Sequence, residues 1–466
     1  MSQFLALDLG AESGRAILAQ LDRGRIQLNE LHRFPNTPVQ LPNGLYWDTL
    51  RLQNELCEGI RTAAKLASKI DGIAVDTWGV DFALVGEHGE MLENPRHYRD
   101  PRTAGVPEQL FETVPRREIF LRTGIQFLEI NSLYQLQTIR RDSPQLLQAA
   151  SRLLFMPDLF NYFLTGQFAS ERTIASTSQF YDPARKCFAV DLLQKLGLPT
   201  RPLCDLMDPG AELGALLPHI ADLHASVYAT ASHDTASAVA AVPATMGENF
   251  AYISSGTWSL MGVELDHPVI DDATLEANFT NEVGVERTIR FLKNIPGLWM
   301  VQECRRAWGR QGLEFTYAEL IERASSAKPL ESILDLDQFT FPGDHPARIR
   351  DYCRRTGQPV PGDPGSMVRV ILQSLAARYK DVLESLERLT HRSIETIHIV
   401  GGGSRNRLLN QLTANSTGRR VVAGPAEATA AGNALTQALG AGAIGSLEEI
   451  RAVARESFPL EEFVPA

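Results

Sequence analysis

The chain has 466 residues, of which 44% are hydrophobic and 22% charged, and its formal net charge is −11. This composition is typical of a globular protein and excludes disordered and fibrous chains. The acidic balance argues against nucleic acid or an anionic membrane surface as the main partner, although backbone amides and local Arg or Lys side chains can still bind an anionic small ligand. At roughly 150 residues per domain, the length predicts two or three domains.

The cysteines and the apolar runs bear on the cellular compartment. The five cysteines are scattered and form no CxxC pair, which fits neither a disulfide framework nor a thiolate zinc site. The N-terminus lacks the basic region and the long apolar core of a signal peptide, and no run of 18 apolar residues occurs. We therefore expect a cytoplasmic protein that does not span a membrane. No motif bears on its oligomeric state.

The predicted elements begin with a β-hairpin. An apolar run over 4–9 ends at Gly10, a small polar turn follows, and apolar residues resume over 16–21. Further along the first half, the apolar spacing predicts a helix, two strands, two long helical regions and a looser, proline-containing connection, in that order. Their ranges are 54–70, 72–76, 80–85, around 117–141, 144–165 and 181–232.

The opening pattern recurs half a chain later, at 250–259, which indicates a duplicated domain. The correspondences, at a constant offset of 246, are Phe4 with Phe250, Gly10 with Gly256 and Ser13 with Ser259. The elements predicted near the C-terminus are a strand at 396–400, a helix from about 405 to 416, a strand at 420–423 and a helix at 427–439. We therefore predict two α/β lobes, 1–244 and 245–466, with a cleft between them.

Three stretches of Gly and small polar residues are candidate ligand sites at strand ends. The turns at 10–15 and 256–259 offer backbone N–H groups and hydroxyls that can cradle phosphate, although either turn alone also fits an ordinary tight hairpin. Asp8, beside the first turn, could hold a hydrated Mg²⁺ or simply cap the turn. The glycines at 401–403 separate a strand from a helix without forming GxGxxG, so a nucleoside fits this flat surface better than a dinucleotide.

Two motifs with carboxylates are candidates for sugar chemistry. Asp234 lies in Ser-His-Asp-Thr (232–235) before a helix of small residues, where it either caps the helix or accepts the proton of a substrate hydroxyl. The stretch 76–82, Asp-Thr-Trp-Gly-Val-Asp-Phe, combines an aromatic side chain with two carboxylates at a strand end. Trp78 on a sugar face is one interpretation, and a buried Trp beside a turn is the other. Trp78 and Phe82 are candidates for contact with a deoxy-sugar methyl group, and each is equally compatible with the core.

A set of motifs, in order over nearly the whole chain, resembles those of the FGGY carbohydrate kinases. They are GAESGR (10–15), DTWGVDF (76–82), YRDPRT (98–103), GIQFLEINSLYQL (124–136), MPDLFNYFLTG (156–166), ASHDTASAV (231–239), SSGTWSLMG (254–262), LKNIPGLW (292–299), HIVGGGSRN (398–406) and AGPAEATAAGNA (423–434). The resemblance implies the α/β actin-like ATPase fold, with two lobes built from duplicated ribonuclease H-like domains around a central cleft. It further implies transfer of the γ-phosphoryl group of Mg-ATP to the 1-hydroxyl of L-rhamnulose, in L-rhamnose catabolism.

The resemblance also implies roles for individual residues, with a small-molecule sugar and ATP as the partners. Asp234 matches the proton acceptor, and Asp8 fits the role of holding Mg²⁺. The residues that match sugar contacts are Gly79, His233, Asp234, Thr235 and Asn294. The residues that match ATP contacts are Ala11, Glu12, Ser13, Gly14, Arg15, Thr257, Gln302 and Gly402.

The first turn departs from the pattern of many family members, which carry Gly-Thr where this chain has Gly10-Ala11-Glu12. A carboxylate near a polyphosphate raises the Coulomb energy unless Glu12 points away. Two alternatives to an L-rhamnulose kinase stay open. One is a kinase for another ketose, such as L-fuculose or L-xylulose, because a pocket separates substrates that differ by one methyl group only weakly. The other is a sugar- or nucleotide-binding protein that keeps the fold without turnover.

Overall fold

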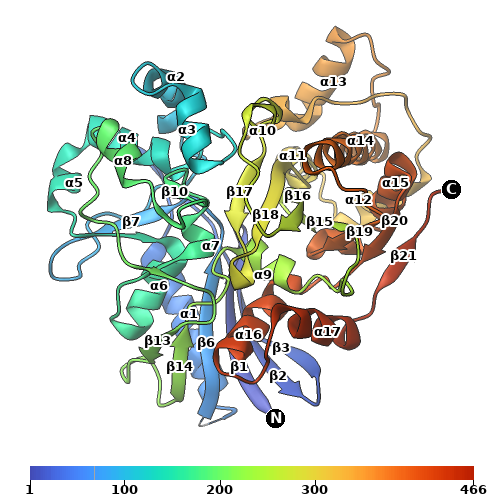
Figure 1. Cartoon of the computed structure of the whole chain (residues 1–466). Coiled ribbons are helices and arrows are strands. Elements are labelled where there is room, and N and C mark those ends of the chain that lie inside the picture. Colours follow the sequence, from blue (N-terminus) through green and yellow to red (C-terminus); the bar gives the residue numbers. More distant parts are fainter. Residues whose placement is uncertain (68) are drawn as a thin grey trace. The chain divides into compact units, whose positions relative to one another are not determined.

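The computed structural model describes residues 1–67 and 69–466 of the chain. Its internal contacts divide the chain into two compact units, each discontinuous in sequence (Figure 1). Unit 1 comprises Met1–Thr245, Glu264–Phe291 and Ala428–Phe458, and unit 2 comprises Met246–Val263, Leu292–Glu427 and Pro459–Ala466. The lobes expected at 1–244 and 245–466, and the cleft between them, stay predictions.

Unit 1 contains a mixed sheet with the strand order β13-β14-β6-β1-β2-β3. The first two strands form the predicted hairpin, and β1 also pairs in parallel with β6. The strands are β1 (Ser2–Leu9), β2 (Ser13–Asp22), β3 (Arg25–Pro35), β6 (Lys69–Thr77), β13 (Glu212–Ala215) and β14 (His224–Tyr228). The hairpin expected at the start of the chain is therefore confirmed.

Helices cover both faces of this sheet, which explains why β1 is a continuous apolar run. Successive side chains of a strand point to opposite faces. Leu5, Leu7 and Leu9 accordingly share a core cluster with residues of α1 and α6, whereas Phe4 and Ala6 share another with residues of α9, α16 and α17. These helices are α1 (Thr49–Ala64), α6 (Met156–Thr165), α9 (Asp234–Ala240), α16 (Ala428–Gly440) and α17 (Leu447–Ser457).

The two long helical regions predicted at 117–141 and 144–165 are wrong. Both are interrupted, and the observed elements are α3 (Arg116–Thr123), α4 (Ser132–Asp142), α5 (Pro144–Ala149), β8 (Arg152–Phe155) and then α6. Gly124 ends α3 because it takes the left-handed conformation, with φ +64°, and its N–H donates to Phe120 O. Residues Arg152–Phe155 form a strand because they pair with β7 (Phe82–Val85), a tertiary contact that overrides the helical pattern.

The remaining elements of unit 1 are short. The helix predicted at 54–70 corresponds to α1, which begins earlier because the Asp48 side chain accepts a hydrogen bond from Arg51 N–H. The predicted end is wrong, because α1 ends at Ala64 and Lys69 and Ile70 already belong to β6; residue 68 lies outside the described residues. The region 181–232 is more ordered than the expected loose connection, because it contains a short helix and supplies β13 and β14 to the main sheet. The short elements are β4 (Val39–Leu41), β5 (Gly44–Tyr46), α2 (Val106–Phe111), β9 (Ser170–Glu171), α7 (Arg172–Ala175), β10 (Tyr181–Asp182), β11 (Cys187–Phe188), α8 (Val190–Lys195), β12 (Leu206–Met207), α10 (Asp272–Ala277) and β17 (Thr280–Val283).

Unit 2 contains the strand order β18-β16-β15-β19-β20-β21. Its strands are β15 (Phe250–Ser255), β16 (Trp258–Leu265), β18 (Ile289–Pro296), β19 (Thr396–Val400), β20 (Arg420–Ala423) and β21 (Glu461–Phe463). Its helices are α11 (Trp299–Arg310), α12 (Tyr317–Ser326), α13 (His345–Arg355), α14 (Pro364–Thr390) and α15 (Arg407–Thr417). The glycines at 401–403 lead into a short 3₁₀ helix, Gly402–Arg405, before α15 begins.

The two sheets share one topology, which supports the duplication. In each, the first strand of a hairpin (β1-β2 or β15-β16) pairs in parallel with a later strand, β6 or β19. That strand pairs in parallel with a further strand, β14 or β20, which in turn pairs with an antiparallel edge strand, β13 or β21. The constant offset of 246 holds only for the first strand of each hairpin. Leu9 pairs with Gly14, but Ser255 pairs with Ser259, so the second turn is one residue shorter and Ser259 corresponds to Gly14 rather than to Ser13.

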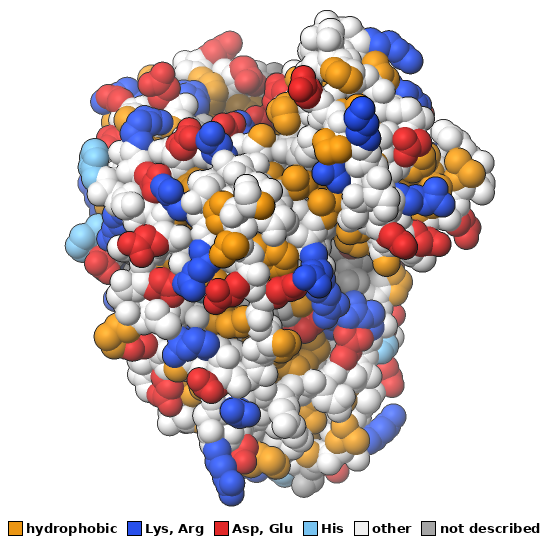
Figure 2. Space-filling view, turned by 90° about the vertical axis from the view of Figure 1, so that its right-hand side faces the viewer, with side chains coloured by type: hydrophobic (Ala, Val, Ile, Leu, Met, Phe, Trp, Pro, Cys, Tyr) orange, Lys and Arg blue, Asp and Glu red, His pale blue; other side chains and the backbone are white. Residues whose placement is uncertain are grey.

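The charged side chains do not gather by sign on the face shown in Figure 2, where acidic and basic groups are interspersed among apolar ones. Of the helices in the described part of the chain, none is both long and apolar enough to cross a membrane.

Candidate active site

Three carboxyl groups of unit 1 come from two neighbouring strand ends and from the start of α9. Asp8 on β1 pairs in register with Asp76 on β6, and Thr77, the next residue, bridges to His233, which precedes Asp234. The Asp8 and Asp76 residues are 5% and 0% exposed. Because the carboxyl ends of parallel strands meet at one edge of a sheet, chain topology alone brings these acids together.

Burial controls the charge on Asp76. It raises the pKa of Asp76 well above its usual range, and the charge of nearby Asp8 raises it further. Asn433 on α16 opposes this effect by donating from Nδ2 to Oδ2 over 2.6 Å, while Oδ1 has no hydrogen-bond partner. The site therefore favours the neutral form of Asp76, which limits repulsion among the three acids.

Asp234 is the first residue of α9, and the cap position before it belongs to His233, which makes no side-chain cap bond. The interpretation of Asp234 as the helix cap is therefore wrong. The Asp234 side chain is 30% exposed; its Oδ1 accepts a hydrogen bond from Thr235 Oγ1 over 3.1 Å and lies 3.6 Å from His233 Nε2. Burial raises the pKa of Asp234, and the neighbouring imidazole opposes that shift. A partly exposed carboxylate at a helix start is free to meet a substrate.

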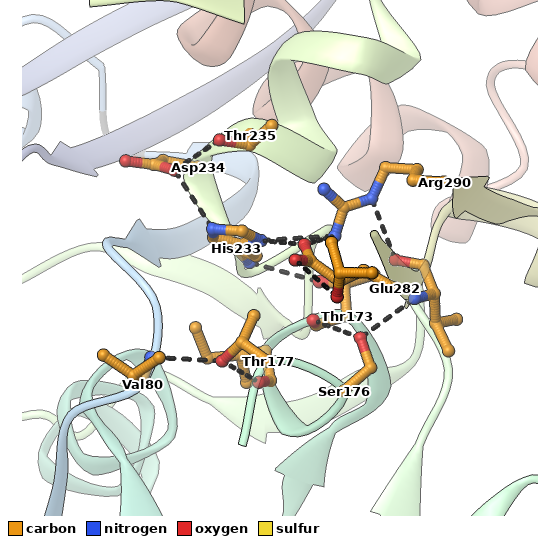
Figure 3. A network of polar contacts seen from close by, with 12 residues as sticks. Val80, Thr173, Ser176, Thr177, His233, Asp234, Thr235, Glu282 and Arg290 are labelled. Atoms are coloured by element: carbon orange, nitrogen blue, oxygen red, sulfur yellow. Dashed lines mark hydrogen bonds and ion pairs between the residues drawn. The ribbon is translucent and has the colours of Figure 1, made fainter. Parts of the chain in front are cut away.

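His233 is held on its other side by a buried ion pair (Figure 3). Its Nδ1 lies 3.2 Å from Arg290 Nη2 and 3.4 Å from Glu282 Oε2, and these two partners are themselves 3.2 Å apart. Burial would raise the pKa of Glu282, but Arg290 and His233 outweigh it, and the pKa is lowered. The fully buried Arg290 also donates from Nε to Val283 O over 3.1 Å. The ring of His233 is therefore fixed in orientation beside Asp234.

Gly79 lies beside the same imidazole. A Cβ atom at this position would be 3.4 Å from His233 Nε2 and 3.3 Å from Thr177 Oγ1, so the glycine leaves room next to the histidine. Trp78, in contrast, belongs to the core: it is 4% exposed, its ring centroid lies 3.9 Å from that of Trp47, and its Nε1 donates to Asp81 Oδ2 over 3.0 Å. The buried alternative is the correct interpretation of Trp78, and it also holds for Phe82.

The first glycine turn is shaped by both packing and charge. Asn36 braces it, because its backbone N–H donates to Glu12 O over 2.9 Å and its Nδ2 donates to Gly10 O over 2.9 Å. A Cβ at Gly14 would come within 2.3 Å of the Phe34 ring, so core packing already requires that glycine. Arg15 forms an ion pair with Asp8. Ala11 and Ser13 are half-buried in the turn, and the Glu12 side chain is exposed.

The remaining predicted contacts lie in unit 2. The second turn is braced by the chain leading into α11, since Gly297 N–H donates to Thr257 O over 3.1 Å and Leu298 N–H donates to Gly256 O over 3.0 Å. Gln302 follows one turn later on α11, and its Oε1 is buried without a hydrogen-bond partner. Asn294 lies on β18, half-buried. Unit 2 thus holds Thr257 beside the start of α11, the helix that also carries Gln302, while Gly79 and His233 are brought together in unit 1.

The three glycines at 401–403 differ in what requires them. Gly401 has φ +81°, and a Cβ at Gly403 would lie 2.0 Å from Ser255 Oγ, so backbone conformation and packing explain these two. A Cβ at Gly402 would meet no atom within 4 Å. The fold therefore gives no reason for glycine at 402, which is the residue predicted to contact ATP.

The carboxylates of Asp8 and of Asp76, which pairs with it in register, are of the kind that binds Mg²⁺. In proteins this ion usually takes one or two carboxylates and completes its coordination shell with water and phosphate oxygens. Within residues 1–67 and 69–466, no group of three or more His, Cys, Asp or Glu side chains could hold a metal ion by itself. The residues therefore fit a hydrated ion that arrives with a nucleotide, and they do not form a closed protein cage.

Comparison with known proteins identifies the family. The model of the FGGY family of carbohydrate kinases, N-terminal domain, matches residues 3–240, and that of the C-terminal domain matches residues 251–441. The chain belongs to the FGGY family of carbohydrate kinases. Its enzyme class is therefore that of the sugar kinases, and the interpretation as a binding protein without turnover is not favoured.

Curated FGGY relatives match over nearly their full length. A protein named rhamnulokinase from Bacteroides thetaiotaomicron is 47% identical, with 99% of this chain and 96% of the relative covered. Another of that name, from Bacillus subtilis, is 38% identical over 99% of this chain and 95% of the relative. Among solved structures, gluconate kinase from Lactobacillus acidophilus is similar with a TM-score of 0.82 at 15% identity, covering 100% of this chain and 94% of that chain. Glycerol kinase of Plasmodium falciparum with ADP has a TM-score of 0.78 at 15% identity and the same coverage. These likenesses confirm the predicted actin-like fold.

Sequence reasoning missed several residues of this site. Glu282, Arg290 and Thr173 each contact a predicted residue, but none stands in a motif that suggests chemistry. Asn433, which contacts Asp76, lies in the motif at 423–434, but no role was predicted for it. The one sequence signal that could have pointed to Arg290 is its apolar surroundings, Ile-Arg-Phe-Leu at 289–292. A charged residue within such a run is expected to be buried and therefore to need a charged partner.

Proposed function

We propose that this protein phosphorylates L-rhamnulose at its 1-hydroxyl with ATP, in the catabolism of L-rhamnose. The observation that supports this substrate is the identity of 37–47% to curated proteins named rhamnulokinase, over nearly the whole chain. On this proposal the enzyme acts in the cytoplasm, where its ATP is available.

The proposed chemistry centres on Asp234. As the sugar 1-hydroxyl oxygen attacks the γ-phosphorus of ATP and the bond to the ADP oxygen breaks, the Asp234 carboxylate takes the hydroxyl proton. A carboxylate suffices because the proton leaves late in phosphoryl transfer, so orientation matters more than basicity. His233 supports this role, since its fixed imidazole lies 3.6 Å from Asp234 Oδ1. Gly79, Thr235 and Asn294 are the other proposed sugar contacts.

The proposed nucleotide contacts are the two glycine turns, Gln302 and Gly402. Backbone N–H groups of the turns would donate to phosphate oxygens at positions already braced by their own hydrogen bonds. Arg15 would supply positive charge beside the first turn, and the exposed Glu12 would point away from the phosphates. Asp8 would hold a hydrated Mg²⁺, which, when bound, neutralises charge on the polyphosphate.

The experiment that tests this function is a coupled assay of ADP release with Mg-ATP and L-rhamnulose, run beside L-fuculose, L-xylulose, glycerol and a control without sugar. The proposal expects turnover with L-rhamnulose well above all the others. Preferential turnover with another ketose would keep the sugar kinase and reject this substrate. Hydrolysis of ATP at the same rate without sugar would reject the assignment of Asp234 as the acceptor of a sugar proton.

A further inference from the structure

The segment Glu171–Thr177 of unit 1 lies outside every motif described above, yet it touches three parts of the proposed sugar site. It consists of the end of β9, the short helix α7 and the two residues that follow. Its polar side chains are buried, with Glu171, Thr173, Ser176 and Thr177 at 1%, 0%, 0% and 5% exposure. Buried polar groups must find partners, and the partners of these four decide what the segment does.

The first contact is with the chain that carries Asp234. Thr173 Oγ1 accepts a hydrogen bond from His233 N–H over 3.1 Å, and Glu171 Oε2 accepts one from Ser232 N–H over 3.2 Å. Thr173 Oγ1 also donates to Glu171 Oε2 over 2.5 Å, which joins the two acceptors. The backbone N–H groups of two successive residues just before Asp234 therefore both donate hydrogen bonds to this segment.

The second contact is with the chain that carries Gly79. Thr177 Oγ1 accepts a hydrogen bond from Val80 N–H over 3.1 Å. Val80 has φ +68°, a left-handed conformation that a β-branched residue adopts only under constraint. Ser132 Oγ and Gln135 Nε2 donate to Val80 O from α4. A strained residue beside Gly79 is thus held from both its N–H and its C=O.

The third contact is with the strand that carries Glu282, the partner of His233. Ser176 Oγ accepts a hydrogen bond from Val283 N–H over 2.9 Å (Figure 3). Each of the three hydroxyls also donates within its own segment: Thr173 to Glu171, Ser176 to Thr173 O over 2.8 Å, and Thr177 to Ile174 O over 2.8 Å. A hydroxyl has one hydrogen, so these local bonds leave each oxygen as an acceptor for the distant N–H.

We propose that Glu171–Thr177 is a positioning segment for the sugar site, in which three oriented hydroxyls and one carboxylate fix the backbones that carry Gly79, Asp234 and Glu282. The inference rests on the proposed function, because it takes these residues as sugar contacts and proton acceptor. None of the four side chains acts on the substrate. Each side chain accepts a hydrogen bond from a backbone N–H group and so acts only through the site residue near that group, which is Asp234, Gly79 or Glu282.

The substitutions Thr173→Val and Thr177→Val test this, because valine has the shape of threonine without the hydroxyl. We expect Thr173→Val to lower kcat about 10-fold to 100-fold with little change in the KM for ATP, since the proton acceptor moves. We expect Thr177→Val to raise the KM for the sugar about 10-fold, since the backbone at Gly79 loosens. Thr173→Ser and Thr177→Ser keep the hydroxyl and should restore most of each loss. Thr413→Val is the matched control, because Thr413 is buried and donates to a carbonyl of its own helix, Leu409 O.

Amide hydrogen exchange gives a readout independent of turnover. Peptides covering 231–236 should exchange faster in Thr173→Val, and peptides covering 78–82 faster in Thr177→Val, while the rest of the chain keeps the wild-type rate. Equal losses in the Val and Ser variants, or unchanged exchange in both peptides, would overturn the proposal. Should Thr173→Val not fold, Thr177→Val and Ser176→Ala test the same statement. If the wild-type protein turns over no ketose, the proposed function fails, but the exchange experiment still decides on positioning.

Discussion

The glycines at 401–403 allow the proposed nucleotide contact to be separated from the stability of the fold. The perturbation is a methyl group added at each position in turn, as Gly401→Ala, Gly402→Ala and Gly403→Ala. The three residues are adjacent in unit 2 and carry the same substitution, so the variants differ only in where the methyl group lies and in what it meets.

The structure predicts a different free energy of unfolding for each variant. At Gly403 the new Cβ would lie 2.0 Å from Ser255 Oγ and 2.6 Å from Ser255 Cβ, an overpacking that costs about 1–3 kcal/mol. At Gly401 the backbone has φ +81° and ψ −175°, a region open essentially only to glycine, and an alanine there costs about 1–3 kcal/mol. Gly402 begins a 3₁₀ helix with open space around it, so alanine there should be neutral or stabilise by about 0.4–1 kcal/mol.

The assays are thermal unfolding without ligand and the KM for ATP at saturating sugar. If a nucleotide packs on Gly402, its methyl group should raise that KM about 10-fold, equivalent to about 1.4 kcal/mol, with no loss of melting temperature. Two results would refute the reasoning. A wild-type KM in Gly402→Ala would remove the nucleotide from this surface, and a melting temperature as low as that of Gly403→Ala would show that the space around residue 402 is not open.

Three further predictions follow from unit 1. Asp234→Asn should lower kcat at least about 100-fold while ATP still binds, measured by turnover and calorimetry; near wild-type turnover would exclude Asp234 as the proton acceptor. Burial raises the pKa of Asp81 from 3.8 to about 6 although Trp47, Trp78 and Gln135 donate to it, so the folded protein binds this proton more tightly than the unfolded chain. Its stabilising contribution is therefore full below pH 3.8 and is lost as the pH rises through 6, about 3 kcal/mol in all. Urea unfolding at a series of pH values should show that the free energy of unfolding of Asp81→Asn lacks this decrease between pH 3.8 and 6. A decrease equal to that of the wild type would contradict the assignment of this proton to Asp81. Val80→Gly should relieve the left-handed strain and keep or raise the melting temperature, yet raise the sugar KM; an unchanged KM would mean that Gly79 does not depend on Val80.

Local patterns predicted the fold where one stretch of chain decides the structure. The hairpin at 4–21 and its recurrence at 250–259 follow from apolar runs interrupted by glycine, and both strands form where expected. The long helix at 117–141 failed because Gly124 ends α3 in a left-handed conformation. The one at 144–165 failed because the pairing of Arg152–Phe155 with β7 depends on a partner about 70 residues away. Periodicity carries no information about such a contact.

In the candidate site, too, the residues in local motifs could be predicted and those defined by distant contacts could not. Asp8, Asp76 and Asp234 could be proposed from sequence because they stand at the ends of apolar strands or at a helix start. The ion pair of Arg290 and Glu282 could not, since its meaning comes from His233, about 50 residues earlier in the chain. The segment Glu171–Thr177 is likewise defined only by the distant N–H groups that it accepts from.

The shared topology of the two sheets explains why their chemistry can differ so sharply. Asp8 on β1 pairs with Asp76 on β6, and the corresponding pair on β15 and β19 is Ser254 with Val400. The two copies thus share the strand ends and their parallel pairing, while the side chains at those ends differ, two acids in one copy and a hydroxyl and a hydrocarbon in the other. A proton acceptor and a cation need the acids, whereas a neutral nucleoside does not. The same contrast continues one residue later, where Thr77 corresponds to Gly401 and the chain turns toward Gly79 in unit 1 and Gly402 in unit 2. The proposed proton acceptor and cation site therefore lie in unit 1, where these strand ends carry carboxylates, and the proposed nucleoside surface lies in unit 2, where they do not.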